Sequence, residues 1–498
     1  MGLLLMSNIF NIAITSKNKK CPHSVNTFVT AAYVFVTAQF LPILNYHALC
    51  YSYTEDDKND IIHFQQSKWY YITMLTILFQ EEKMNKAAFE TPNILNKYFY
   101  VWALFLPITS ILVIPNIQGT FPSTIFAIIS FFLVLLVKQR RIQLKGYLWD
   151  LVVIFILYTF LSLVSQLING MVDIPSFDKV ILIDPSDTST DMFRSSFFTQ
   201  SLYLLAGIIT FVYIKRYYND SWEKPIFIGI LLFTIYGIYE FLYFLIFNDY
   251  GDFLTNRNFE GHDTINLGNQ LMTIGSVVIQ RVNGLALEPS MFAFTVLPFW
   301  IYSYFTGRKK VSLILFVGLC LSTSTTAILG IFIYLIPYIR KSNKLVLFYI
   351  ITFLTLFLLI KFDFVYKAFD EIVLQKLQQE TASGIERTSF FKNHIDYFLN
   401  MNVFSILFGI GFGTVRSTDF FSTILINNGI IGLSIITLLF FYPIIKLKNN
   451  TKNLGLKLSL LVIFLTLMIS VPEFSFPSIW LFLGIAYNQI FKQKIETY

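Results

Sequence analysis

The chain has 498 residues, of which 55% are hydrophobic and only 13% carry a charge, and this balance excludes a soluble domain of such length. The formal net charge is +7, yet the basic residues stand in short clusters between apolar runs, where they orient membrane helices. We therefore expect an all-α, polytopic membrane protein that contacts membrane lipid and binds no nucleic acid.

Residues 1–96 form an N-terminal extension with one or two membrane segments, of which 25–44 is the best candidate. Residues 97–498 have the pattern of a polytopic membrane domain. Apolar runs predict spanning helices at 98–114, 121–137, 147–168, 197–214, 225–247, 289–305, 345–361, 429–445, 458–471 and 478–491. Together with shorter segments, about 11–13 transmembrane helices are expected.

Basic clusters follow alternate apolar runs and should face the cytoplasm. The opposite, extracytoplasmic side then receives the loops 171–195, 248–284 and 362–416, the last being the largest. Within the late loop, 363–380 and 385–399 look amphipathic and should lie on the membrane surface.

Residues 311–339 lie between two basic clusters and are too few for two crossings of about 20 residues each. The polar run Leu321-Ser-Thr-Ser-Thr-Thr326 stands in their middle. We expect a short helical hairpin whose polar turn faces an internal site, since polar backbone at membrane depth has to be buried in protein or line a cavity. A hairpin packed by small residues is the alternative.

The stretch Arg281-Val-Asn-Gly-Leu-Ala-Leu-Glu-Pro-Ser290 joins a polar loop to a hydrophobic helix. Pro289 suits the first turn of a helix, because it has no N–H to leave unsatisfied, so the helix should begin there with Glu288 at the cap. A helix N-terminus carries a partial positive charge, and Arg281 beside it adds a permanent cation; together they suit an anion. The alternative is an ordinary cap with Arg281 as an interface anchor.

Arginines on the outer side are further candidates, because outer loops are normally poor in basic residues. Arg387 lies in the large late loop, and Arg416 precedes the final helices. His394 follows on nearly the same helix face as Arg387 and is a candidate proton acceptor, although a lone loop histidine is more often a bystander.

No metal centre and no cofactor is predicted. The chain has neither an Asp-x-Asp motif nor a P-loop, and its scattered cysteines indicate no disulfide framework or zinc site. The cysteines are Cys21, Cys50 and Cys320. Three spaced aspartates, Asp184, Asp187 and Asp191, are more typical of a solvated loop than of a metal site, although a metal site remains the alternative.

Three segments together resemble the bacterial O-antigen polymerase and O-antigen ligase superfamily. They are the stretch 281–290, the Ser/Thr hairpin, and Phe408-Gly-Ile-Gly-Phe-Gly413 followed by Asn427-Asn-Gly-Ile-Ile-Gly432. The resemblance implies a fold similar to GT-C glycosyltransferases, with a large late extracytoplasmic loop, in the bacterial cytoplasmic membrane. It implies that Arg281 and Arg387 bind the pyrophosphate of a lipid-linked glycan.

The implied reaction transfers a glycan from undecaprenyl pyrophosphate onto another lipid-linked repeat unit, with inversion and without a metal. The donor and the acceptor are both undecaprenyl-pyrophosphate-linked oligosaccharides, and a chain-length regulator and a flippase are the expected accessory partners. The candidate catalytic residues are Arg281, Arg387, Glu288 and His394, and the candidate substrate-binding residues are Arg416, Asn283, Gly284, Ser322 and Ser324.

One departure from the family concerns the segment after the Gly-x-Gly-x-Gly motif. The ligase branch typically carries a histidine there, whereas this chain has Arg416-Ser-Thr-Asp419, which favours a polymerase. A ligase-like transferase remains an alternative. A transporter or flippase of lipid-linked glycan is another, but no second copy of the Arg281 stretch or of the hairpin indicates repeated halves.

Overall fold

The structure is a computed structural model of the whole chain. It describes residues 91–114, 119–172, 174–185, 193–252, 270–274, 277–286, 288–341 and 382–495. The predicted segments 25–44, 345–361 and 363–380 lie outside the described residues.

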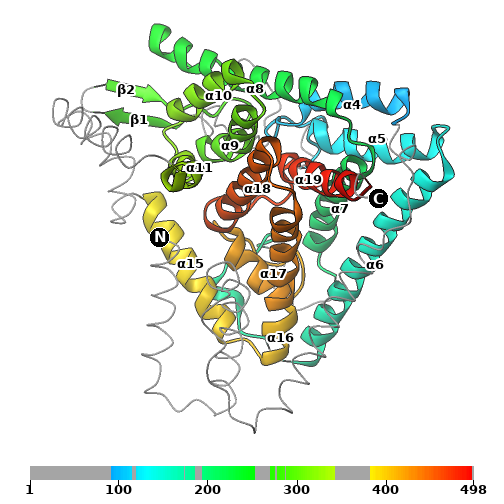
Figure 1. Cartoon of the computed structure of the whole chain (residues 1–498). Helices are drawn as coiled ribbons and strands as arrows, with labels where there is room; N and C mark the ends of the chain where they lie inside the picture. Colours follow the sequence, from blue (N-terminus) through cyan, green and yellow to red (C-terminus); the bar gives the residue numbers. More distant parts are fainter. Residues whose placement is uncertain are drawn as a thin grey trace, which may run out of the picture. The chain divides into compact units, whose positions relative to one another are not determined.

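The described chain is mostly helical, as predicted (Figure 1). Its helices are α4 (Asn93–Phe105), α5 (Pro122–Leu136), α6 (Arg141–Met171), α7 (Ser195–Tyr217), α8 (Glu223–Phe247), α9 (Pro289–Phe305), α10 (Lys309–Leu321), α11 (Thr325–Lys341), α15 (Ala382–Leu399), α16 (Val403–Phe408), α17 (Phe420–Lys446), α18 (Thr451–Ile469) and α19 (Pro477–Ile495). Short 3₁₀ helices η5 (Phe177–Lys179) and η6 (Asp220–Trp222) and strands β1 (Leu271–Ile274) and β2 (Val277–Gln280) complete the elements.

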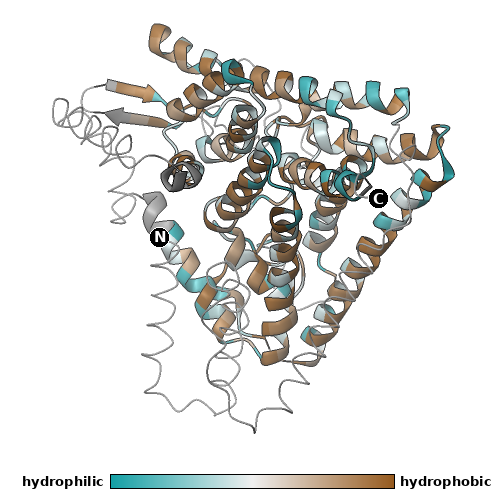
Figure 2. Ribbon diagram, viewed as in Figure 1, coloured by the Kyte–Doolittle hydropathy of each residue, from teal (hydrophilic) through white to brown (hydrophobic). Residues whose placement is uncertain are grey.

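Five of the described helices are long and apolar enough to cross a membrane, and hydrophobic residues run along most of their length (Figure 2). They span 141–171, 195–217, 220–247, 420–446 and 451–469. The membrane class is therefore confirmed, while the count of 11–13 spans stays a prediction.

Helices α9 and α18 form the centre of the described domain. α18 packs against α9, α17 and α19, and α19 also packs against α7. α9 is buried at nearly every position, as expected for a helix that is apolar on all sides. By contrast, only 17% of the most apolar window of α6 is buried, against 67% for α18, so α6 is peripheral.

The described part departs from the all-α prediction in the predicted loop 248–284, where β1 and β2 pair in antiparallel fashion. Leu271 lies opposite Gln280, and Ile274 lies opposite Val277. The hairpin packs against α8. Its second strand ends at Gln280, so Arg281 directly follows the end of that strand.

The predicted helix 98–114 is wrong at its C-terminal end, because α4 stops at Phe105. Pro107 lacks an N–H and its ring would collide with a carbonyl of the preceding turn, so the helix cannot continue through it. Beyond the proline, the backbone N–H groups of Thr109 and Ser110 both donate to the carbonyl of Leu285 at 3.2 Å. This segment therefore lies against the stretch that follows Arg281.

Two groups of polar contacts lie at opposite ends of α18. At its start, Lys452 pairs with Asp220 and Glu223; just after its end, Ser470 contacts Arg387. At 1.5 Å per residue these groups are roughly 27 Å apart along the helix, close to the ~30 Å of a bilayer's hydrocarbon core. The spacing fits a protein with one polar group at each membrane surface.

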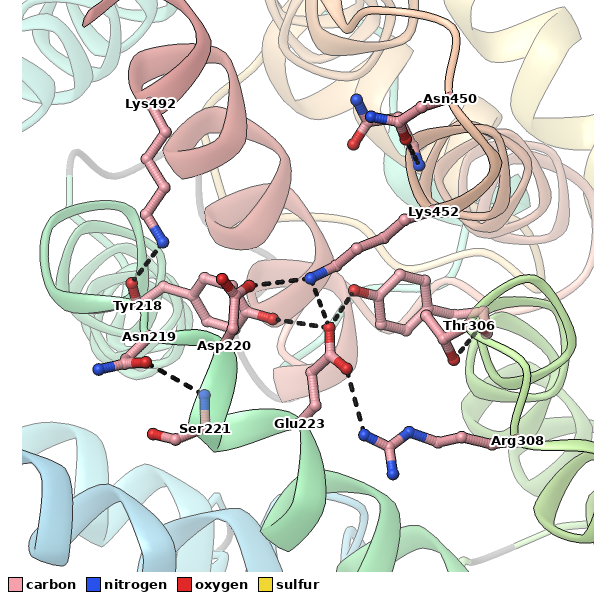
Figure 3. A network of polar contacts seen from close by, with 12 residues as sticks. Tyr218, Asn219, Asp220, Ser221, Glu223, Thr306, Arg308, Asn450, Lys452 and Lys492 are labelled. Carbon is pink, nitrogen blue, oxygen red and sulfur yellow. Dashed lines mark hydrogen bonds and ion pairs between the residues drawn. The ribbon is translucent and has the colours of Figure 1, made fainter. Parts of the chain in front are cut away.

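A polar network closes the first of these ends (Figure 3). The carboxylate of Glu223 accepts from Lys452 at 2.7 Å, from Arg308 at 3.2 Å and from the Tyr302 hydroxyl at 2.9 Å. Asp220 binds the same Lys452 at 2.8 Å. We call these five residues the Glu223 network; it joins the starts of α8 and α18 to the turn between α9 and α10.

Two loops predicted to be extracytoplasmic meet at the other end. Val415 pairs with Leu182 in an isolated β-bridge, and the Tyr397 hydroxyl donates to the carbonyl of Pro175 at 3.0 Å. Segments 171–195 and 362–416 therefore share one end of the described domain. The side of the membrane that this end faces stays a prediction.

A labelling experiment tests that orientation. In a variant whose natural cysteines are replaced by serine, Ser383→Cys on α15 should react with a membrane-impermeant maleimide in intact or outer-membrane-permeabilised cells. Lys309→Cys, at the start of α10, should react only after the cytoplasmic membrane is opened. The reverse pattern would invert the topology.

Candidate functional site

Arg281 is held in place by the turn of the α10–α11 hairpin. Its Nε donates to the Thr323 hydroxyl at 3.0 Å and to the Ser322 carbonyl at 3.3 Å, and Nη2 donates to the Thr323 carbonyl at 3.3 Å. Nη1 donates to the side-chain oxygen of Gln270 at 2.6 Å. These contacts, among the described residues, leave one N–H on each terminal nitrogen of the five-donor guanidinium for an anion.

The predicted helical hairpin is confirmed, since α10 and α11 are short helices joined by a polar turn. Ser322 and Ser324 are buried, and Thr323 between them has a left-handed backbone with φ 45°. A threonine rarely adopts this conformation, and here it directs both the carbonyl and the hydroxyl of Thr323 to Arg281. The turn thus faces an interior polar cluster, as expected.

Arg387 of α15 lies close to the same hairpin and is linked to it through Ser470. Its Nη1 lies 3.5 Å from both the carbonyl and the hydroxyl of Ser470, and that hydroxyl is 2.6 Å from the Thr326 hydroxyl at the start of α11. The charge of Arg387 lowers the pKa of Arg281, so the two guanidiniums are near enough to repel each other. An anion between them would relieve that repulsion.

Glu288 completes this cluster as the N-cap of α9, which begins at Pro289 as predicted. Its carboxylate accepts from the Ser290 hydroxyl at 3.1 Å. Burial lowers the pKa of Arg281 to about 10, an effect that Glu288 opposes and Arg387 reinforces. Arg281 therefore stays charged at neutral pH.

This electrostatic balance predicts a shift in the alkaline limb of the pH–rate profile. Arg281 loses its charge as pH rises through its lowered pKa of about 10, and removing the negative charge of Glu288 should lower that pKa further. The Glu288→Gln variant should therefore lose activity at a lower pH than the wild-type chain. An unshifted limb would contradict this electrostatic balance. A fall of roughly 100-fold in rate at neutral pH would be a separate effect, expected if Glu288 is also the proton acceptor of the reaction.

Four predicted substrate-binding residues are buried in the structure, and three of them, Ser322, Ser324 and Gly284, shape the local backbone. The Ser322 hydroxyl donates to the Leu319 carbonyl at 2.7 Å, and the Ser324 hydroxyl accepts from the Thr326 N–H at 3.2 Å. Asn283 is buried, and Gly284 has φ 52° and packs on Gly237 of α8. A side chain at Gly284 would be strained by that φ, so the glycine lets the stretch approach α8.

His394 belongs to a second cluster, further along α15. It is fully buried, and its Nδ1 is 2.6 Å from the Phe390 carbonyl. Burial lowers the pKa of His394, opposed by the Phe390 carbonyl, the Asp419 carboxylate and the backbone of Arg416. The imidazole is therefore neutral at pH 7, beside the segment in which the sequence lacks a histidine.

Asp419 is the N-cap of α17 and anchors this second cluster. It accepts from the Ser422 N–H at 2.7 Å and from the hydroxyls of Ser422 and Ser417 at 2.8 and 3.1 Å. Burial raises the pKa of Asp419, while these donors and His394 lower it. Arg416 points away from this cluster in an exposed ion pair with Glu473.

The Gly-x-Gly-x-Gly motif has a packing role. Gly409 has φ 79°, and a Cβ there would lie 2.3 Å from the backbone of Asn427. The Asn427 side chain in turn accepts from the Val415 N–H at 2.9 Å and donates to its carbonyl at 2.7 Å. The motif thus lets its loop lie directly on α17, which is kinked at Gly429, where the predicted helix began.

Of the residues that position the arginines, Thr323 lies in the polar run that the sequence indicated, whereas Gln270 and Ser470 had no signal in the sequence. Gln270, Thr323 and Ser470 are polar residues of ordinary loops and helix ends, and their contacts join segments far apart in the chain. Asp419 had a usable signal, because Asp-x-x-Ser before an apolar run is typical of an N-cap.

Among the described residues, no group of three His, Cys, Asp or Glu side chains could hold a metal ion. Asp184 accepts from the Ser195 hydroxyl at 2.9 Å, while Asp187 and Asp191 lie outside the described residues. No family model, curated protein or solved structure matches this chain.

Proposed function

We propose that this chain is a glycosyltransferase of the bacterial cytoplasmic membrane that polymerises undecaprenyl-pyrophosphate-linked oligosaccharides into a surface polysaccharide. The growing glycan leaves its pyrophosphate carrier and joins another lipid-linked repeat unit, with inversion at the sugar carbon. The bond from that carbon to the pyrophosphate oxygen breaks, the bond to the acceptor oxygen forms, and the acceptor hydroxyl loses its proton.

The observation that carries the proposal is the proximity of Arg281 and Arg387 beside the α10–α11 hairpin, which Arg281 contacts directly and Arg387 contacts through Ser470. As the glycosidic bond breaks, the leaving pyrophosphate gains negative charge, and preorganised guanidiniums stabilise that charge most strongly where water is excluded. Arg281 is fixed by its contacts with Thr323 and Gln270, so little reorganisation is needed during the reaction. Two arginines can therefore supply the positive charge that a metal provides in other transferases.

Burial separates the two candidate proton acceptors. Glu288 is half-buried and its charge acts on Arg281, so it stands beside the proposed pyrophosphate site. His394 is fully buried, seven residues further along α15 than Arg387, and it cannot reach an acceptor hydroxyl without movement of the helix. We assign proton acceptance to Glu288 and a positioning role to His394.

A ligase-like transferase is the second candidate, and the placement of His394 favours it. The ligase branch of the resembled superfamily carries a histidine in the segment after the glycine motif, and His394 packs against that segment, where burial lowers its pKa and the Asp419 charge opposes the lowering only in part. A ligase would use the same arginines but a different acceptor.

The product formed in a deletion strain tests the proposal. Loss of the long-chain ladder with accumulation of single lipid-linked repeat units indicates a polymerase. Accumulation of full-length lipid-linked polymer that is not transferred to its final acceptor indicates a ligase. Loss of even a single outward-facing unit indicates a flippase and contradicts both transferase assignments.

A further inference from the structure

A run of aromatic rings leads away from the arginine site toward α6 and α7. In order, the rings are Phe474, Phe412, Tyr158, Phe197 and Phe193, with successive centroids 5.6, 5.6, 6.4 and 5.5 Å apart. We call this run the aromatic track. It starts beside the site, because Phe474 lies in the short loop that follows Ser470, the residue contacted by Arg387.

The rings of the track are partly accessible. Phe474, Phe412, Tyr158 and Phe197 are half-buried, and Phe193 at the far end is 39% exposed. Three of them belong to loop segments: Phe193 precedes α7, Phe412 follows α16, and Phe474 joins α18 to α19. The other two, Tyr158 and Phe197, lie in helices α6 and α7, which are long and apolar enough to cross a membrane.

Phe193 is held in an unusual conformation. Its φ of 59° is left-handed, which an aromatic residue rarely adopts without strain. The Phe193 N–H donates to the side-chain oxygen of Gln166 on α6 at 3.4 Å, which helps to fix a ring that remains exposed. Strain of this kind is concentrated where a side chain has to be presented to a ligand.

Polar groups accompany the rings. The Tyr158 hydroxyl pairs with that of Ser201, and Arg416, which is 55% exposed at its side chain, pairs with Glu473 next to Phe474. Aromatic faces with a few polar groups at their edges are typical of sites for amphipathic small molecules. Sugars fit this description, because their C–H groups suit the negative face of a ring and their hydroxyls suit polar neighbours.

We propose that the aromatic track binds the glycan chain of the substrate, with sugar rings lying against the accessible faces and edges of these aromatic rings. This glycan-binding subsite lies outside the arginine cluster, and its assignment rests on the proposed function, which identifies the substrate as a lipid-linked glycan. The rival occupant is the isoprenoid tail of the carrier lipid. The glycan is favoured because most of the track lies on loops, whereas a tail would lie along the apolar faces of the spanning helices.

Binding measured without turnover tests the track. The probes are oligosaccharides cut from the surface polysaccharide of the producing strain, and undecaprenyl phosphate, each titrated into the purified chain in lipid nanodiscs. Phe193→Leu, Phe412→Leu and Phe474→Leu keep the apolar bulk but remove the ring, and each should weaken oligosaccharide binding on the order of tenfold, which corresponds to about 1.4 kcal/mol. The matching Phe→Tyr variants should retain affinity, and undecaprenyl phosphate binding should be unchanged.

The control is Phe160→Leu, which removes a ring that is 57% exposed on α6 and lies outside the track. Equal losses in the control, unchanged oligosaccharide affinity in the track variants, or no oligosaccharide binding by the wild-type chain would each overturn the inference. Weakened binding of undecaprenyl phosphate alone would assign the track to the lipid tail. If the wild-type chain makes no polymer yet binds oligosaccharides through these rings, the proposed function fails while the track stands.

Discussion

Replacing either Arg281 or Arg387 with alanine should lower the rate of polymerisation on the order of 100-fold or more. Each charge-assisted contact to a phosphate is worth about 1.5–3 kcal/mol, and more where it strengthens in a water-poor transition state. Because the two arginines would serve one pyrophosphate, the double alanine variant should be barely slower than the poorer single variant. Arg281→Lys should recover little, since an ammonium cannot reproduce the planar fork that contacts Thr323 and Gln270.

Lys392→Ala is the matched control for these variants, because Lys392 is an exposed cation on the same helix as Arg387. It should leave the rate unchanged. Rates should be measured on purified protein, with the amount in the membrane determined for every variant. Two additive losses in the double variant would mean that the arginines act on different groups.

Replacing Glu223 with alanine should lower the stability of the folded protein more than any other substitution proposed for this chain. The change leaves Arg308 and Lys452 without their shared carboxylate and the Tyr302 hydroxyl without its acceptor. Breaking a fully buried pair costs about 3–5 kcal/mol; since both cations are about one-third exposed, water screens part of the cost, and roughly 2–4 kcal/mol is expected. The apparent melting temperature of the detergent-solubilised protein measures this.

Lys224→Ala is the control for Glu223→Ala, because Lys224 is the next residue on α8 and is exposed. It should melt within a degree or so of the wild-type chain, as surface substitutions usually do. Equal melting temperatures for the two variants would contradict the stabilising role of the Glu223 network. Neither change touches the arginine site, so the activity of folded Lys224→Ala should be normal.

Local chemistry was enough to predict where several elements begin. Pro289 and Glu288 set the start of α9, because the missing N–H of proline and the cap position depend only on neighbouring residues. The signal for the β-hairpin was also local: Gly275 and Ser276 separate two runs rich in β-branched residues, a pattern typical of a tight hairpin. Long apolar helices dominate the chain, so this short signal does not stand out from them.

Tertiary contacts account for what the sequence could not indicate. The hydroxyls of Thr323, Thr326 and Ser470 look alike in sequence, and their roles arise from the packing of α11 and α18. His394 shares a helix with Arg387, yet it packs against the Arg416–Asp419 segment rather than joining the arginines. Helical spacing predicts that the two residues share a face of α15, but it does not predict which other segments pack against each end of that face.

Titration of the purified chain in nanodiscs with undecaprenyl pyrophosphate, the leaving product of the proposed reaction, tests the central claim most directly. We expect saturable binding by the wild-type chain, a loss on the order of tenfold or more in affinity in both Arg281→Ala and Arg387→Ala, and little further loss in the double variant. Undecaprenyl phosphate, with one phosphate fewer, should bind more weakly. Wild-type affinity for the pyrophosphate in both single variants would contradict the account.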